Sequence, residues 1–304
     1  MGDIPEFKRG QINFVIVGFP GLHSRYYGLG FSAHVLGVRV HFAGNGTFLL
    51  LFAREKRLRK PMYYILINLA VCDVLFSTTT LPKIISRYWF SDGYVSFTGC
   101  FVQMYFVHLF GLVHGLILAV MAFDRYVAVC IPSDTLILFK DSTILMLCVV
   151  AWMIPQSCVL MLVIRAYPLP YCAANTIIQC YCDHVAITKL ACTDRTPYGF
   201  PGFVFAMVLL ITPLSFILFS YTSIIIAVLR ISTNQERLKA FSTCSSQLII
   251  IALYFFTQVH LPPMINPLIY CLRAKEVREA LFKSLEKSTF HFKRKINADV
   301  STIC

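Results

Sequence analysis

Three consecutive residues near the middle of the chain could work as a charge-controlled switch. Asp124, Arg125 and Tyr126 stand at the end of a long apolar stretch, residues 100–130. A charged pair at the end of a membrane span is costly unless the charges pair or reach water. One interpretation is an arginine that extends to the membrane surface beside an aromatic anchor. The other is a switch, in which Asp124 holds Arg125 at rest and then releases it toward a cytoplasmic partner.

The composition indicates that lipid surrounds much of this chain. Hydrophobic residues make up 57% of its 304 positions, and charged residues only 14%, against about 25% in soluble domains. The net charge of +12 could suggest nucleic acid. However, the Lys and Arg residues cluster between apolar stretches and near the C-terminus, the pattern of cytoplasmic loops. We therefore expect membrane lipids as partners and no nucleic acid.

The apolar stretches predict an all-α transmembrane bundle in one domain, residues 1–304. A helix needs about 20 apolar residues to cross a bilayer. Five stretches are long enough: 28–53, 62–85, 100–130, 142–165 and 201–230. A sixth runs from 247 to 272, followed by a basic tail, 273–304. The tail is predicted to begin with a short amphipathic helix on the inner membrane surface, and the alternative is a solvated charged tail.

The basic loops set the orientation of the spans. Lys and Arg follow the first stretch at 54–60 and the fifth at 230–239, and they recur in the tail. Positive residues favour the cytoplasmic side, so the segment 166–200 is expected outside. Cysteines there can oxidise to disulfides. The outer cysteines are Cys100, Cys172, Cys180, Cys182 and Cys192.

Motifs along most of the chain resemble the rhodopsin-like G-protein-coupled receptors, and within them the odorant receptors of the fish type. The longest are Met121-Ala-Phe-Asp-Arg-Tyr-Val-Ala-Val-Cys130, Lys239-Ala-Phe-Ser-Thr-Cys244 and Pro262-Pro-Met-Ile-Asn-Pro-Leu-Ile-Tyr270. Shorter ones are Gly44-Asn45, Lys60-Pro-Met-Tyr-Tyr64, Leu69-Ala-Val-Cys-Asp73, Leu81-Pro-Lys83 and Ser220-Tyr221. The resemblance implies a seven-helix receptor in which Tyr221 and Tyr270 join the Asp124-Arg125-Tyr126 switch.

The resemblance also implies how the outer cysteines pair. Cys100 would bridge Cys182, and Cys172 would bridge Cys192, although cysteine spacing alone cannot determine connectivity. Cys180 would then be the odd thiol. A zinc site from Cys180, Cys182 and His184 is the alternative, and the disulfides explain the cysteines better. We expect no metal and no cofactor.

An interior polar network is expected from Asn45, Asp73 and Asn266. A carboxylate inside a span normally faces the bundle interior and pairs with polar groups or an ion. Sodium is one interpretation, by resemblance to the family. A hydrogen-bond network between helices, without an ion, is the favoured one.

A ligand pocket is expected in the outer half of the bundle, where such pockets are mostly apolar with a few polar groups. Its candidate residues recur at helical spacing on the third and fifth spans: Met104, Val107, His108, Gly111, Leu112, Phe205, Ala206 and Leu209. Each is also compatible with plain helix packing. His108 is the most informative, because a histidine at that depth needs a partner.

The sixth and seventh spans look shortened. The partial spans 247–258 and 259–272 rise only about 18 and 21 Å, against about 30 Å of hydrocarbon. A single span over 247–272 would place the basic tail outside, against the positive-inside tendency. A re-entrant hairpin keeps the tail inside but needs its backbone buried in protein. We expect an internal deletion between residues 241 and 266.

Arg39 is a second departure from the family pattern. It lies near the centre of the first stretch, where an arginine costs about 2.5–3.5 kcal/mol on insertion scales. A segment whose sequence has drifted from the family pattern, or one wrongly predicted as a span, is favoured over a buried charge that serves a ligand.

The leading functional hypothesis is a multi-pass odorant receptor of the plasma membrane. It would couple a small-molecule odorant to a heterotrimeric G protein of the stimulatory class, docked at Arg125 and around 230–245. The alternative is a non-signalling, receptor-derived membrane protein, retained in the endoplasmic reticulum. An enzyme is not expected, because no nucleophile–base pair or metal-ligand spacing lies in a plausible site. A transporter or channel lacks the paired ionisable residues and inverted repeat typical of that class.

Overall fold

The computed structural model describes residues 13–18, 42–55, 61–131, 141–171, 175–193, 196–230, 235 and 251. Several predictions therefore lie outside the described residues. They are Arg39 and the first part of the first span, Cys172, the interval 241–266 and both partial spans apart from residue 251, Asn266, Tyr270, and the tail 273–304.

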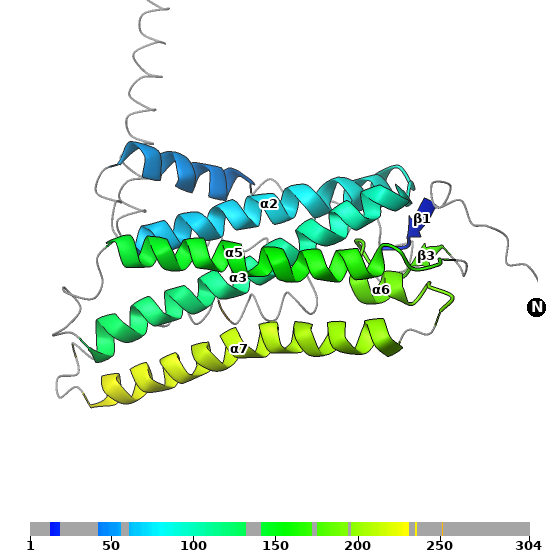
Figure 1. Ribbon diagram of the computed structural model, residues 1–304. Helices are drawn as coiled ribbons and strands as arrows, with labels where there is room; N and C mark the ends of the chain where they lie inside the picture. The colour runs from blue at the N-terminus through cyan, green and yellow to red at the C-terminus, as the bar shows by residue number, and fades with distance from the viewer. Residues whose placement is uncertain are drawn as a thin grey trace, which may run out of the picture.

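Long helices running side by side form the described bundle (Figure 1). They are α2 (Pro61–Trp89), α3 (Phe97–Cys130), α5 (Asp141–Ala166) and α7 (Thr196–Leu229). Each contains a segment long and apolar enough to cross a membrane, and no fifth such helix occurs within the described ranges. Residues 42–54 form a further, shorter helix, whose Phe48 and Leu51 are buried in the core.

The third helix forms the centre of the bundle. In its most apolar window 61% is buried inside the protein, against 22% for α5 and 28% for α7. It packs against α2, α5 and α7. Large apolar side chains on α5 and α7, such as Met153 and Phe219, are exposed instead. Such faces are suited to lipid.

All four long helices begin before the residues expected from hydropathy, and α2 and α5 also end later. Helix α3 begins at Phe97, where the Ser96 hydroxyl accepts a hydrogen bond from the Gly99 amide at 3.2 Å. This is an N-cap, which satisfies one of the amides left open at a helix start. Helix α2 runs past residue 85 to Trp89, with Arg87 in its last turn.

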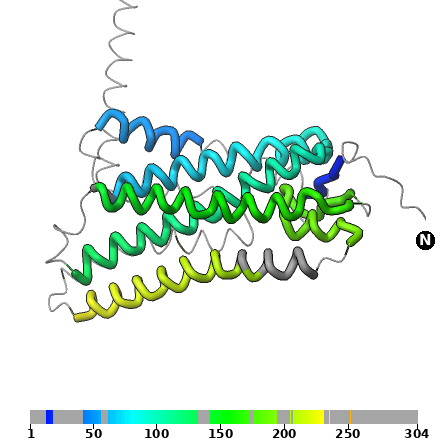
Figure 2. The backbone as a smooth tube through the Cα atoms, in the orientation of Figure 1, coloured from blue at the N-terminus to red at the C-terminus, as the bar shows by residue number. Residues whose placement is uncertain are grey.

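A small sheet closes one end of the bundle, beside the loop between α5 and α7 (Figure 2). Strand β1 (Asn13–Ile16) lies between β2 (Tyr94–Ser96) and β3 (Thr176–Ile177). It pairs antiparallel with β2 and parallel with β3. The short helix α6 (His184–Thr188) lies at the same end. The sheet thus joins the N-terminal segment to both outer loops.

Two hydrophobic clusters hold these layers together. The outer cluster packs Phe14 of β1 against Phe97 and Tyr171, with both pairs of ring centroids 5.9 Å apart. The inner cluster extends along the helices and includes Leu69, Ile117 and Tyr221. The outer cluster positions the loop that carries the site.

Candidate functional site

The outer loop is covalently tied to the central helix. Cys100 on α3 and Cys182 in the loop form a disulfide with Cα atoms 5.4 Å apart, joining residues 82 positions apart in sequence. This is the bridge that the family resemblance implied. Cys192 is also disulfide-bonded. Its predicted partner Cys172 lies outside the described residues, so that pairing remains a prediction.

The odd thiol, Cys180, is buried and free. Burial raises the pKa of this thiol to about 12, so it stays protonated at neutral pH and is a poor nucleophile or metal ligand. Cys182 is already in a disulfide. The zinc alternative therefore lacks two of its three ligands. Across the described segments, no group of three His, Cys, Asp or Glu side chains is placed to hold a metal.

The loop then follows one face of α3 and covers part of the expected pocket. The Cys182 amide donates to Gln103 Oε1 at 3.1 Å. Met104 and Val107 are only 1% and 4% exposed, and Met104 belongs to the outer cluster. These two predicted pocket residues are thus closed off as packing residues in this structure.

The accessible part of the predicted pocket begins at His108. His108, Gly111 and Leu112 on α3 are partly exposed, and so is Leu209 on α7. The helical backbone of α7 includes 205 and 206, but the side chains of Phe205 and Ala206 lie outside the described part. The part that Phe205 and Ala206 play in the pocket wall opposite α3 therefore remains a prediction.

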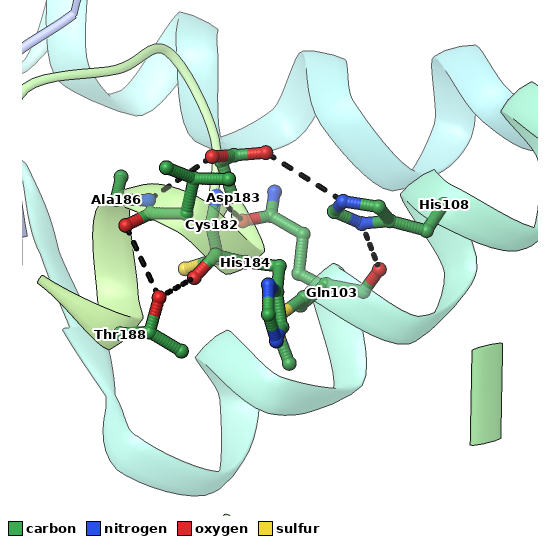
Figure 3. A network of polar contacts seen from close by, with 9 residues as sticks. Gln103, His108, Cys182, Asp183, His184, Ala186 and Thr188 are labelled. Atoms are coloured by element: carbon green, nitrogen blue, oxygen red, sulfur yellow. Dashed lines mark hydrogen bonds and ion pairs between the residues drawn. The ribbon is translucent and has the colours of Figure 1, made fainter. Parts of the chain in front are cut away.

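His108 lies between two hydrogen-bond acceptors (Figure 3). Its Nδ1 is 2.9 Å from the Met104 carbonyl oxygen, and its Nε2 is 3.5 Å from Asp183 Oδ1. A neutral imidazole has only one N–H donor, whereas the imidazolium has two. A protonated ring would donate at both positions, and its charge would then face the carboxylate of Asp183. Both side chains keep partial access to solvent, 27% and 21%.

Asp183 also holds the start of α6. Its Oδ2 accepts from the Ala186 amide at 3.0 Å, the geometry of an N-cap. Burial raises the pKa of this carboxyl, but the hydrogen bond and charge of His108 and the Ala186 amide outweigh it, and the pKa lies below its usual value. Sequence reasoning missed Asp183. Its position in the sequence could have indicated it, because Asp183 directly follows Cys182, the loop cysteine expected to form a disulfide with Cys100 on α3.

The neighbouring His184 is uncharged at neutral pH. Burial, followed by the positive charge of His108, lowers its pKa to about 4, with Asp183 acting in the opposite direction. His184 therefore adds no second positive charge beside the His108–Asp183 pair.

A second histidine–aspartate pair lies deeper in the bundle. His114 Nε2 on α3 is 3.1 Å from Asp73 Oδ1 on α2, with side chains 5% and 0% exposed. Asn45 is equally buried on the 42–54 helix. Sequence reasoning identified Asp73 and Asn45 but not His114, which gives the carboxylate a basic partner from within the protein.

The expected switch residues lie at the opposite end of α3. Arg125 Nε is 3.5 Å from Asp124 Oδ2, and Arg125 Nη2 contacts the sulfur of Met62 at the start of α2. The ring of Tyr126 lies 6.1 Å from that of Phe219 on α7. Tyr221 is buried in the inner cluster. The arginine is thus held by its neighbouring carboxylate and by an adjacent helix.

Comparison with known structures first defines the class of protein. The crystal structure of squid rhodopsin is similar with a TM-score of 0.66, over 87% of this chain and 82% of rhodopsin, at 18% sequence identity. At that identity the likeness shows the fold alone. The chain has the fold of the rhodopsin-like receptors.

Sequence comparison then defines the family. The olfactory receptor family profile matches residues 35–261. Human olfactory receptor 2AT4 is 36% identical over 93% of this chain and 95% of its own length. Human olfactory receptor 52K1 is 32% identical over 90% and 95%. The chain belongs to the olfactory receptor family, as the motifs predicted, and it is a multi-pass membrane receptor rather than an enzyme.

Two details of the comparison bear on the predictions. These relatives are human, so the fish type remains a prediction. The alignment with receptor 2AT4 extends over 305 positions but includes only 93% of this 304-residue chain. Part of the relative therefore has no counterpart here.

Proposed function

We propose that this olfactory receptor passes a signal along α3 from the outer loop to its cytoplasmic end. The observation that carries the proposal is the placement of His108 and the Asp124–Arg125 pair on this one 34-residue helix. A rise of 1.5 Å per residue separates them by about 25 Å. A ligand at His108 and a partner at Arg125 would therefore act on opposite membrane faces.

The odorant site is proposed beneath the outer loop. His108 supplies the polar group, Gly111 and Leu112 supply the accessible face of α3, and Phe205, Ala206 and Leu209 supply the facing part of α7. Ligand sites between helices combine an apolar lining with a few placed polar groups. The disulfide-tied loop would form the outer boundary of this site.

The cytoplasmic site is proposed to bind a heterotrimeric G protein of the stimulatory class. In the described state, Asp124 and Met62 hold Arg125. Activation would release Arg125 toward the partner, with Tyr126, Tyr221 and Tyr270 completing the site. A bound partner can shift the equilibrium only by contacts that the released state alone offers.

The receptor is proposed to form one domain, residues 1–304, in the plasma membrane. Its proposed spans are 28–53, 62–85, 100–130, 142–165 and 201–230, with the partial spans 247–258 and 259–272. Asn45, Asp73 and Asn266 would form the interior polar network, and Cys172 would bridge Cys192.

Replacement of the switch arginine tests the proposal. Arg125→Ala should abolish odorant-evoked cyclic AMP while cell-surface labelling of a tagged chain remains at the wild-type level. A matched control is Arg165→Ala, which removes an exposed arginine at the outer end of α5. Unchanged signalling in Arg125→Ala would overturn the proposed switch.

A retained, non-signalling protein is the second candidate. The shortened interval 241–266 and Arg39 in the first span favour it, because the expected deletion would remove helix from the wall opposite α3. Surface labelling separates the two candidates. Display with an odorant response supports the receptor, and retention in the endoplasmic reticulum supports the alternative.

A further inference from the structure

The outer histidine–aspartate pair has consequences for which odorants can bind. We propose that His108 and Asp183 form an ion pair whose charges cancel, so that the part of the site beside this pair accepts uncharged odorants with a hydroxyl or carbonyl oxygen and excludes carboxylates. This inference rests on the proposed odorant site and names the ligand class for that site.

The charges of the pair cancel within the protein. His108 donates from both ring nitrogens only as an imidazolium, and Asp183 faces it as a carboxylate. The adjacent His184 is uncharged, because burial lowers its pKa to about 4. An acidic odorant would therefore meet no uncompensated positive charge on His108.

The pair nevertheless retains hydrogen-bonding capacity for a neutral ligand. The 3.5 Å separation of His108 Nε2 and Asp183 Oδ1 is longer than the 2.7–3.2 Å typical of N–H···O hydrogen bonds. The other carboxylate oxygen, Oδ2, is used by the cap of α6. A hydroxyl can accept from Nε2–H and donate to Oδ1 at the same time, whereas a carbonyl oxygen can only accept.

Charged odorants are opposed by one member of the pair or the other. A carboxylate that accepts from His108 comes close to the negative Oδ1 of Asp183. An alkylammonium that donates to Asp183 comes close to the positive ring of His108. Each would also lose its hydration in the half-buried site without a compensating free charge. The expected order of affinity is alcohol, then aldehyde or ketone, then carboxylate and amine.

The test measures binding of aliphatic alcohols, aldehydes, carboxylates and amines of matched chain length. Ligand-induced thermal stabilisation of the purified full chain in lipid nanodiscs gives the affinity without a G protein. In the wild type, the alcohol should bind at least about tenfold more tightly than the carboxylate of equal length, about 1.4 kcal/mol. Equal or tighter carboxylate binding would overturn the inference, and so would the absence of binding by every compound.

Two single substitutions should change the preference in opposite directions. Asp183→Asn keeps an N-cap oxygen but leaves His108 uncompensated, so carboxylate affinity should rise about tenfold, or about 1.4 kcal/mol. His108→Gln leaves Asp183 uncompensated, so amine affinity should rise instead. Asp92→Asn is the matched control, because it removes one outer carboxylate that faces Lys83 rather than His108. The control should keep the wild-type order.

The outcomes separate this inference from the proposed function. Neutral-ligand binding with the predicted charge reversals supports the inference even if cyclic AMP does not respond, in which case the signalling proposal alone fails. Odorant-evoked cyclic AMP with no reversal in either variant overturns the inference and leaves the receptor function intact. If one variant does not fold, the other still gives a reversal of defined sign.

Discussion

Helix α3 carries two histidine–aspartate pairs whose surroundings differ sharply. His108–Asp183 connects the helix to a loop, at 3.5 Å and with both side chains partly exposed. His114–Asp73 connects α3 to α2, at 3.1 Å and with almost no exposure. The same two residue types therefore serve a solvent-accessible site in one place and a closed interior in the other.

The difference between the pairs is one of solvation. Water and a ligand can reach the outer pair, so removing one partner leaves a charge that solvent can stabilise. The inner carboxylate is shielded from water, and an unpaired charge there carries a large desolvation cost. Recognition therefore suits the outer pair, while the inner pair suits the joining of two helices.

The largest effect is expected from breaking the inner pair. His114→Ala should lower the free energy of unfolding by about 3–5 kcal/mol, because Asp73 stays buried without that partner. His108→Ala should cost only about 1 kcal/mol. Thermal unfolding of the purified receptor measures both. The double variant Asp73→Asn, His114→Gln should recover part of the loss, and equal losses at the two sites would contradict the comparison.

Removal of the Cys100–Cys182 disulfide should affect the outer pair alone. The double variant Cys100→Ser, Cys182→Ser is expected to lose about 2–4 kcal/mol of stability. Hydrogen exchange should rise in 182–188 but not around Asp73 and His114. Cys158→Ser, at a free and half-buried cysteine, is the control. Equal exchange increases at both pairs would show that the loop supports the whole bundle.

Acidification should weaken the outer loop through His184. Its pKa is about 4 in the folded protein against an ordinary value of 6.5, so the unfolded state binds more protons between these values. Stability is therefore full above pH 6.5 and falls as the pH drops toward 4, by about 2 kcal/mol between pH 7 and pH 5. Asp183, whose pKa is lowered from 3.8, loses its contribution only at lower pH.

Thermal unfolding of the receptor at a series of pH values measures this dependence. The variant His184→Gln cannot take up the proton and should show a smaller loss between pH 7 and pH 5. The same loss in the variant as in the wild type would assign the effect to another group.

The smallest effect concerns the cap of α6. Asp183→Ala should cost about 1 kcal/mol more than Asp183→Asn, because only Asn retains an oxygen for the Ala186 amide. Both variants lose the charge that faces His108. Hydrogen exchange of the α6 amides distinguishes them, and identical exchange would show that the cap contributes little.

Much of this receptor follows from its sequence. Hydropathy and basic loops predicted the membrane class, because lipid requires long apolar helices whose backbone bonds are satisfied internally. The motifs predicted the olfactory receptor family, which the family profile and the relatives confirm. Resemblance also implied the Cys100–Cys182 bridge, which the structure contains.

Other features depended on the tertiary structure. Helical spacing placed Met104, Val107 and His108 on one face of α3, but it could not show that the first two are buried and the third stays accessible. The partners Asp183 and His114 also came only from the fold. Hydropathy is a property of neighbouring residues, whereas such pairs depend on how helices rotate and where a disulfide holds a loop. The sequence alone identified the triplet Asp124-Arg125-Tyr126, whereas the pairing of His108 with Asp183 required the tertiary structure.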